Sequence, residues 1–294
     1  MRPNNLAQPK SIIIPFGIRE KYIAKNLREN NIISSEYLFL IYKHIFFWGK
    51  NIYSGEYEFS PGANIIDVTK KLVTRGVKYR KVTIPGGLTI YQIGQILENS
   101  LGLMGSFPYD IPEGALFPET YFYTYGDNIN LIIKSMKKAM TETINNLTAT
   151  RRLPKPISNT SELIILASIV EKEAKLEEEK PIIASVYLNR LKIGMRLQSC
   201  PTALYAVTKG GRNPLTRKPS KEDMKIDSSY NTYKVANLPP SPIACPSKSS
   251  IEAVLNPSAT EYLYFVVCDA FGGHKFAASY QQHLKNIKAP ECVR

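Results

Sequence analysis

The stretch LIILASIVEKEAKLEEEK, residues 163–180, begins as an apolar run and turns abruptly into carboxylates. Its apolar residues recur at helical spacing, with Leu163, Leu166 and Val170 on one stripe, and isoleucines fill the rest of the circumference. A helix that is apolar nearly all round is normally buried. Yet this one ends on Glu171-Lys172-Glu173. Either the chain reaches solvent there, or a carboxyl is held where water is scarce, which would raise its pKa towards the range of a general acid.

On a helical wheel, Glu171 and Glu173 flank the buried stripe on opposite sides, because residues at i and i+2 do not face each other. They cannot form the two carboxyls that flank one bond in a common glycosidase. Either one can still act alone. The glutamates at 177–179 lie where the next helix would begin, and their charge suits its dipole.

Composition bounds the fold and the partners. A chain of 294 residues with 44% hydrophobic and 21% charged residues is typical of a globular protein of two or three domains. The net charge of +13 favours an acidic partner: nucleic acid, anionic lipid or an acidic polymer. Basic residues are scattered, without a recognition helix or an RNA-binding aromatic motif, which argues against nucleic acid.

Targeting signals and metal-ligand patterns are not visible in the sequence. No stretch approaches the roughly 20 apolar residues of a membrane span, and the N-terminus MRPNNLAQPK has no apolar signal-peptide core. The four cysteines lack C-x-x-C spacing, and no His/Cys cluster suggests a metal, so we expect neither metal nor cofactor. The cysteines allow up to two disulfides, and their pairing stays open.

The N-terminal third repeats itself. IIIPFGIREKYIAKNL (12–27) and VTIPGGLTIYQIGQIL (82–97) match at a strand, a Pro-x-Gly turn and a short helix, and FSPGANIIDVTKKL (59–72) is a weaker third copy. The copies are either small α/β units used for packing or modules that bind a polymer. Both readings predict an α+β fold, because the regular β–α alternation of a doubly wound sheet is missing.

Further along the chain, we expect a helix over 131–147 and a basic, Pro-containing linker over 151–161 as a domain boundary. Thr160 or Ser161 is expected to cap the buried helix. A second helix should begin near Pro181 and end at Gly194, and a strand should cover 261–269.

Six segments in this order resemble the endolytic murein transglycosylases, the YceG-like family: LASIVEKEA, ASVYLNRLKIGMRLQSCPTALY, YNTY, LPPSPIACP, YLYFVV and GGHKF. EGALFPETY and the I-P-x-G segments resemble the N-terminal part of that family, which carries a LysM-like region. The resemblance implies LysM-like strand–helix units followed by a mixed α+β catalytic domain. The expected segments are a first LysM-like unit at 1–80, a second with a connecting helix at 81–155, and the catalytic domain at 156–294.

The resemblance also implies an activity. Family members are lyases that cut within peptidoglycan glycan strands and leave 1,6-anhydro-N-acetylmuramic acid ends, which would terminate or trim nascent strands. One glutamic acid protonates the glycosidic oxygen and then takes the proton of the muramic C6 hydroxyl, so neither a second carboxylate nor a cofactor is required. By this resemblance the catalytic residue falls on Glu171.

Other site residues carry over from the same motifs. Gln198, Tyr230, Asn231 and His274 match family positions and are expected to line the glycan groove. This chain also departs from the family: Cys200 stands where an Asp is usual, Gly86 where a Glu is usual, and Ser241 where a Gly is usual. Because Cys200 removes a charge near the expected cleft, the alternative is a catalytically impaired peptidoglycan-binding protein.

The expected partners are peptidoglycan glycan strands, a peptidoglycan synthase and an anionic membrane surface, but not nucleic acid. The resemblance implies a place in the cell envelope, at the periplasmic face of the inner membrane. Family members begin with a cytoplasmic segment and one membrane helix, neither of which is visible in this chain.

Overall fold

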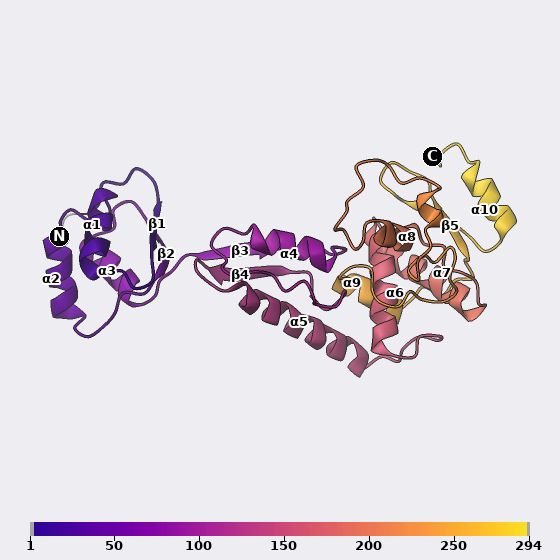
Figure 1. Ribbon diagram of the computed structural model, residues 1–294, viewed down its shortest axis with the longest axis horizontal. Helices are drawn as coiled ribbons and strands as arrows, with labels where there is room; N and C mark the ends of the chain where they lie inside the picture. Colours follow the sequence, from indigo (N-terminus) through magenta and orange to yellow (C-terminus); the bar gives the residue numbers. More distant parts are fainter. Residues whose placement is uncertain (1–2, 293–294) are drawn as a thin grey trace. The chain divides into compact units, whose positions relative to one another are not determined.

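The computed structural model describes residues 3–292 and divides the chain into two compact units (Figure 1). The first unit runs to Val82 and also includes 100–105 and 121–129. The second consists of 83–99, 106–120 and the chain from Asn130 onward. Most of the expected middle segment, 81–155, therefore lies in the same unit as 156–294.

The first unit is built on a two-stranded antiparallel sheet of β1 (Lys10–Ile14) and β2 (Gly55–Phe59). Helices α1 (Glu20–Glu29) and α2 (Glu36–Phe46) lie between these strands in sequence, and α3 (Ile65–Val73) follows β2 (Figure 1). Alternate residues of β1 point inward, as a half-buried strand requires. The core of this unit consists of buried apolar side chains from all five elements: Ile12, Ile14, Ile23, Ala24, Leu27, Ile32, Ile33, Phe39, Tyr57, Phe59, Ile65, Val68 and Leu72.

The predicted repeat of strand, turn and helix is confirmed. In the first copy β1 leads through Gly17, at φ +76°, into α1, and in the second β3 (Tyr79–Thr83) leads through Gly87, at φ +79°, into α4 (Ile90–Glu98). A positive φ at the turn explains why glycine recurs at this position. The weaker copy corresponds to β2 and α3. The LysM-like character of these units stays a prediction.

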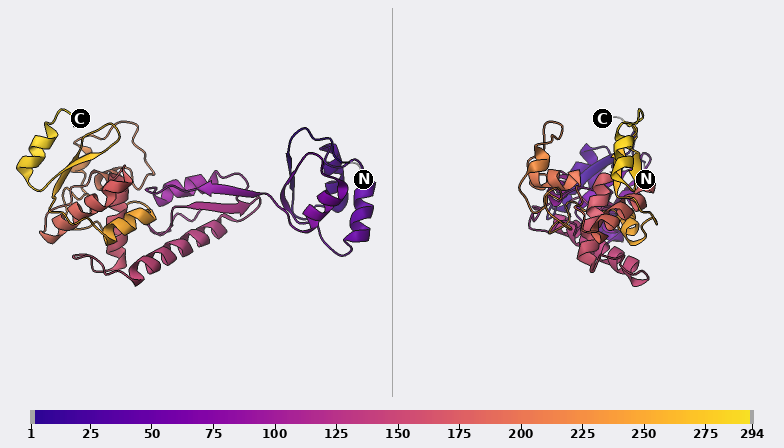
Figure 2. Two further views of the ribbon diagram at one scale, coloured as in Figure 1. Left: turned by 180° about the vertical axis from the view of Figure 1, so that it is seen from behind. Right: turned by 90° about the vertical axis from the view of Figure 1, so that its right-hand side faces the viewer.

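The centre of the second unit is α6 (Thr160–Glu173), which packs against α7 (Lys180–Lys192), α8 (Cys200–Val207) and α9 (Lys248–Leu255) (Figures 1 and 2). Every residue from Leu163 to Val170 is buried, so the predicted buried helix is confirmed. The cap differs from the expectation. Asn159, not Thr160 or Ser161, is the N-cap: its side chain accepts the backbone N–H of Glu162, because the helix already begins at Thr160.

The rest of the second unit frames this helix. The remaining elements of the second unit are α5 (Ile129–Ala149), η1 (Glu177–Glu179), η2 (Asp223–Lys225), β5 (Tyr264–Val267), β6 (His274–Ala277) and α10 (Tyr280–Ile287). β4 (Thr120–Thr124), which pairs with β3, belongs to the first unit except for Thr120. β5 and β6 form an antiparallel hairpin in which Val267 pairs with His274. These helices and small sheets confirm the α+β class. Among residues 3–292, no helix is both long and apolar enough to cross a bilayer.

Candidate active site

The C-terminal end of α6 presents two glutamates to different surroundings. Residues 163–170 of α6 are buried among the helices of the second unit, whereas Glu171 and Glu173 are partly buried as whole residues. The carboxyl group of Glu173 itself is buried. As the helical wheel predicts, the two side chains have no common partner: Glu171 contacts the start of α9, and Glu173 contacts α7 and the residue before α8.

Glu171 contacts the N-cap residue of α9 and pairs with a buried lysine. Its Oε2 accepts the backbone N–H of Ser247 at 3.0 Å, the hydroxyl of Ser247, and the hydroxyl of Ser250 at 2.6 Å. The ammonium of Lys180, whose side chain is only 3% exposed, lies 3.5 Å away from the same oxygen.

The turn before α4 packs directly on this carboxylate. A Cβ atom at Gly86 would overlap Glu171 Oε1, and it would also lie 3.3 Å from Ser247 Cβ. The Glu expected at this position therefore does not fit here without movement of Glu171. Gly87 fixes the turn, because its backbone N–H donates to the Cys245 carbonyl at 2.9 Å.

Glu173 has neutral donors instead. Its Oε1 accepts the hydroxyl of Tyr187 at 2.8 Å and that of Ser199 at 2.6 Å, and both of these residues are at most 1% exposed. Burial raises the pKa of Glu173, and the two hydroxyl bonds with the charges of His274 and Arg190 offset only part of that shift. Among the described residues, no Lys, Arg or His nitrogen lies within 4 Å of its oxygens in an ion pair. Glu173 therefore stays protonated to a higher pH than an ordinary glutamate does.

Ser199 is fixed by its own environment. Its backbone N–H donates to Thr232 Oγ1 at 3.0 Å, and the preceding Gln198 has a positive φ of 50°. Cys200 follows at the start of α8 and is partly buried. Burial and the nearby charge of Glu173 raise the pKa of the Cys200 thiol, so it stands beside Glu173 as a neutral group.

The residues predicted to bind substrate differ in their exposure and in their hydrogen-bond partners. Gln198 is exposed, one residue from Ser199. Tyr230 is partly buried, its hydroxyl 2.6 Å from Ser241 Oγ and its ring 4.9 Å from that of Tyr205. Asn231 is fully buried, and its amide donates to two carbonyls of the preceding loop, at 3.0 and 2.8 Å. Asn231 therefore holds that loop together.

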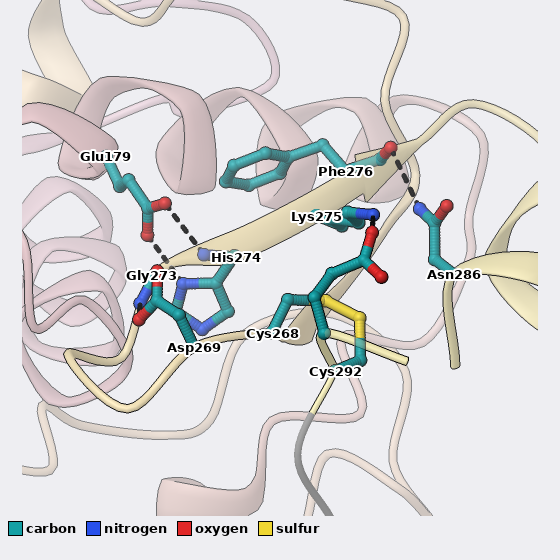
Figure 3. The surroundings of a disulfide bond; sticks show 10 residues. Glu179, Cys268, Asp269, Gly273, His274, Lys275, Phe276, Asn286 and Cys292 are labelled. Carbon is teal, nitrogen blue, oxygen red and sulfur yellow. Dashed lines mark hydrogen bonds and ion pairs between the residues drawn. A yellow bond between two sulfur atoms is a disulfide. The ribbon is translucent and has the colours of Figure 1, made fainter. Parts of the chain in front are cut away.

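His274 is also an internal group. Its Nδ1 lies 2.6 Å from Glu179 Oε2, and its backbone N–H donates to Glu179 Oε1 at 2.8 Å (Figure 3). The side chain is 3% exposed and stands edge-on to Phe265. Its link to the site is therefore electrostatic: the charge of His274 lowers the pKa of Glu173. Neither Asn231 nor His274 is placed where its side chain meets solvent.

A disulfide supports the hairpin that carries His274. Cys268, directly after β5, is bonded to Cys292, while Cys200 and Cys245 are free (Figure 3). Within the hairpin, Asp269 Oδ1 accepts the backbone N–H of Gly273 at 2.7 Å. The pairing could not be chosen from sequence, because the 24-residue separation carries no spacing signature.

Sequence reasoning missed the partners of both glutamates and one further carboxyl. Tyr187, Ser199 and Lys180 stand in segments that read as ordinary helix or loop, and no local pattern marks them. Glu113 is the further carboxyl: burial raises its pKa to about 7, although the backbone N–H of Ile90 donates to it at 3.0 Å. In the sequence, only its position in EGALFPETY, a segment that resembles the family, could have pointed to Glu113.

A buried carboxyl with two hydroxyl donors and no bound cation can give up a proton and take it back, which is the chemistry of an enzyme with one acid/base group. Residues 12–289 match the YceG-like family. The chain belongs to the YceG-like family.

Individual relatives agree with this assignment. The chain is similar to a Bacillus subtilis protein named endolytic murein transglycosylase, with 31% identity over 94% of this chain and 83% of that one. It is also similar to a Streptococcus pneumoniae protein of the same name, with 36% identity over 60% of this chain but only 31% of that one. Among solved structures, the yceG-like protein lmo1499 from Listeria monocytogenes matches at a TM-score of 0.61 and 28% identity, over 95% of this chain and 99% of that one.

Proposed function

We propose that this protein is an endolytic peptidoglycan transglycosylase, a lyase that cuts the bond between N-acetylmuramic acid and N-acetylglucosamine within glycan strands. The names of its relatives support the substrate and the reaction class. The observation that carries the chemistry is the buried Glu173 carboxyl with its raised pKa. The protein would produce strands with 1,6-anhydro-N-acetylmuramic acid ends and so terminate or trim them.

The proposed reaction needs one carboxyl in two protonation states. Protonated Glu173 gives its proton to the glycosidic oxygen as the bond from C1 to that oxygen breaks. The C6 hydroxyl of the same muramic residue bonds to C1, and its proton passes to the Glu173 carboxylate. No water is consumed, and the enzyme ends protonated as it began. A carboxyl with a raised pKa suits both steps near neutral pH.

Glu171, which the family resemblance suggested, is the second candidate for this role. We favour Glu173, because its carboxyl has neutral hydroxyl donors and a pKa raised by burial, whereas Glu171 Oε2 is already engaged by the Lys180 ammonium and by three donors around Ser247. Glu171 would instead anchor α9 and the turn at Gly86. That Glu171 is the acid/base residue stays a prediction, and variants of the two glutamates can decide between it and the assignment to Glu173.

The rest of the proposed setting follows from the family and the charge. The first unit would hold glycan strands as LysM-like modules, with Gln198 and Tyr230 along the groove. A peptidoglycan synthase and an anionic membrane surface are proposed partners, at the periplasmic face of the inner membrane. The disulfide between Cys268 and Cys292 supports an oxidising compartment of this kind.

Product analysis tests the proposed function. Purified peptidoglycan digested with the protein should release muropeptides whose muramic ends are lighter by one water than the reducing ends made by a hydrolase. Binding to peptidoglycan without such ends would favour the alternative, an impaired binding protein in which Cys200 replaces a required Asp. A Cys200→Asp variant is the matched comparison, because it restores the family residue.

A further inference from the structure

A cleft of about 320 Å³ lies within the second unit, beside the end of α6. Its walls are mostly apolar and come from α8 and the loops around it: Pro201, Leu204, Tyr205, Pro214, Leu215 and Ile243. Thr89, Gln92, Thr208 and Gly211 add polar atoms. Lys172 is the one charged side chain among the residues that line it.

The Lys172 ammonium has few partners of its own. It donates to the Gly87 carbonyl at 3.1 Å, and among residues 3–292 no carboxylate oxygen lies within 4 Å of it. A lysine has three donors, so the remaining ones can meet a ligand. Burial lowers the pKa of Lys172, and the charge of Glu171 opposes that shift. An anion in the cleft would accept the donors that the Gly87 carbonyl leaves free.

The cleft lies at the same end of α6 as the glutamate that we propose as the acid. Lys172 directly precedes Glu173, and Pro201 lies two residues after Ser199, which donates to Glu173 at 2.6 Å. Two of the residues that line the cleft are therefore near neighbours in the chain of Glu173 and of its hydrogen-bond partner.

We propose that this cleft is the subsite for the muramic residue, and that Lys172 binds the carboxylate on its lactyl branch. This inference rests on the proposed function. An N-acetylamino sugar offers an apolar ring face and methyl group to the apolar walls, and amide and hydroxyl groups to the polar rim. The lactyl carboxylate is the anionic group that distinguishes a muramic residue from N-acetylglucosamine. In strands with peptide stems the lactyl carboxyl is an amide, so the stem is a second source of the same anionic group, which the experiment below distinguishes from the lactyl carboxylate.

Glu113 helps to shape the opposite wall. Tyr205 lines the cleft, and its hydroxyl donates to Glu113 Oε1 at 3.3 Å. Because burial raises the pKa of Glu113 to about 7, this carboxyl is mostly neutral in mildly acidic solution and does not repel an anion there. Arg212 adds a positive charge near Glu113.

Steady-state kinetics of Lys172→Gln on defined strands test the inference. The substrates are strands stripped of stems, the same strands with the lactyl carboxyl amidated, and strands with intact stems. On stripped strands we expect KM to rise about tenfold and kcat to change by less than about twofold, as for loss of one charge-assisted hydrogen bond in the ground and transition states alike. On amidated strands, wild type and variant should have the same KM. Intact strands separate the two sources: a raised KM there means that Lys172 also meets a stem carboxylate, and an unchanged KM limits it to the lactyl group.

Lys192→Gln is the matched control, because it removes one exposed positive charge elsewhere in the second unit. It should leave every KM unchanged. An equal KM for wild type and Lys172→Gln on stripped strands, or an equal rise on stripped and amidated strands, would overturn the inference. Calorimetric binding of a stripped tetrasaccharide to both proteins gives the same comparison without turnover. Failure of the proposed function would show differently, as an absence of anhydro ends with wild type on every substrate.

Discussion

Replacing Glu113 by Gln should remove a loss of stability that sets in as the pH rises. In the folded protein this carboxyl is buried between the start of α4 and Tyr205, and burial raises its pKa from 4.5 to about 7. In the unfolded chain it regains an ordinary pKa. Between these two values the folded state therefore binds more protons than the unfolded state.

The sign and the size follow from that difference. A carboxyl with a raised pKa stabilises the fold fully below pH 4.5, and its contribution is lost as the pH rises through 7. A difference of about 2.5 between the two pKa values, at about 1.4 kcal/mol for each unit, gives about 3.5 kcal/mol in the free energy of unfolding. Gln at 113 keeps the acceptor for the Ile90 N–H but cannot ionise.

Urea unfolding followed by circular dichroism between pH 5 and 8 measures this effect. The wild type should lose stability relative to Glu113→Gln as the pH rises, by up to about 3 kcal/mol. Glu119→Gln, which changes an exposed carboxyl of the same segment, should track the wild type. Parallel curves for wild type and Glu113→Gln would refute the reasoning, because they would mean that Glu113 titrates alike in both states.

Three more substitutions test other parts of the structure. Ser199→Ala removes a hydrogen bond that lowers the pKa of Glu173, so the pH–rate profile should move to higher pH; an unmoved profile would contradict the proposed role. Lys180→Met leaves Glu171 without its buried cation, and the free energy of unfolding should fall by about 3 kcal/mol in a urea titration, whereas a loss below about 1 kcal/mol would speak against the pair. Cys268→Ser opens a 24-residue loop, and should cost about 3 kcal/mol by the loop-entropy relation, measured against the oxidised wild type; equal stability of the two would argue that the disulfide does not constrain the unfolded chain.

The sequence was sufficient for features that depend on local patterns. The apolar run at 163–170 predicted a buried helix, because only a helix surrounded by other elements can be apolar on every side. Two Pro-x-Gly turns and a weaker copy that keeps Gly62 predicted three strand–helix pairs, since a positive φ between a strand and a helix favours glycine. The ends of the helices and strands were predicted only to within a few residues. The helix capped by Asn159, for example, begins earlier than expected.

The site was predicted only in part. A helical wheel places Glu171 and Glu173 on opposite flanks, but it does not say which flank meets Lys180 and which meets Tyr187 and Ser199. Those partners come from other elements, so the different surroundings of the two glutamates are a property of the tertiary packing. For the same reason the sequence could not predict which cysteines pair, nor that the Asn231 amide donates to two carbonyls of the preceding loop.

The central claim is that Glu173 alone serves as acid and base, and the most direct measurement is anhydro-end release by two reciprocal variants. Glu173→Gln should abolish release, by at least about a thousandfold, while melting near the wild-type temperature. Glu171→Gln should keep measurable release even where the lost ion pair lowers its stability. Release by Glu173→Gln beside a folded but inactive Glu171→Gln would contradict the account and return the acid/base role to Glu171.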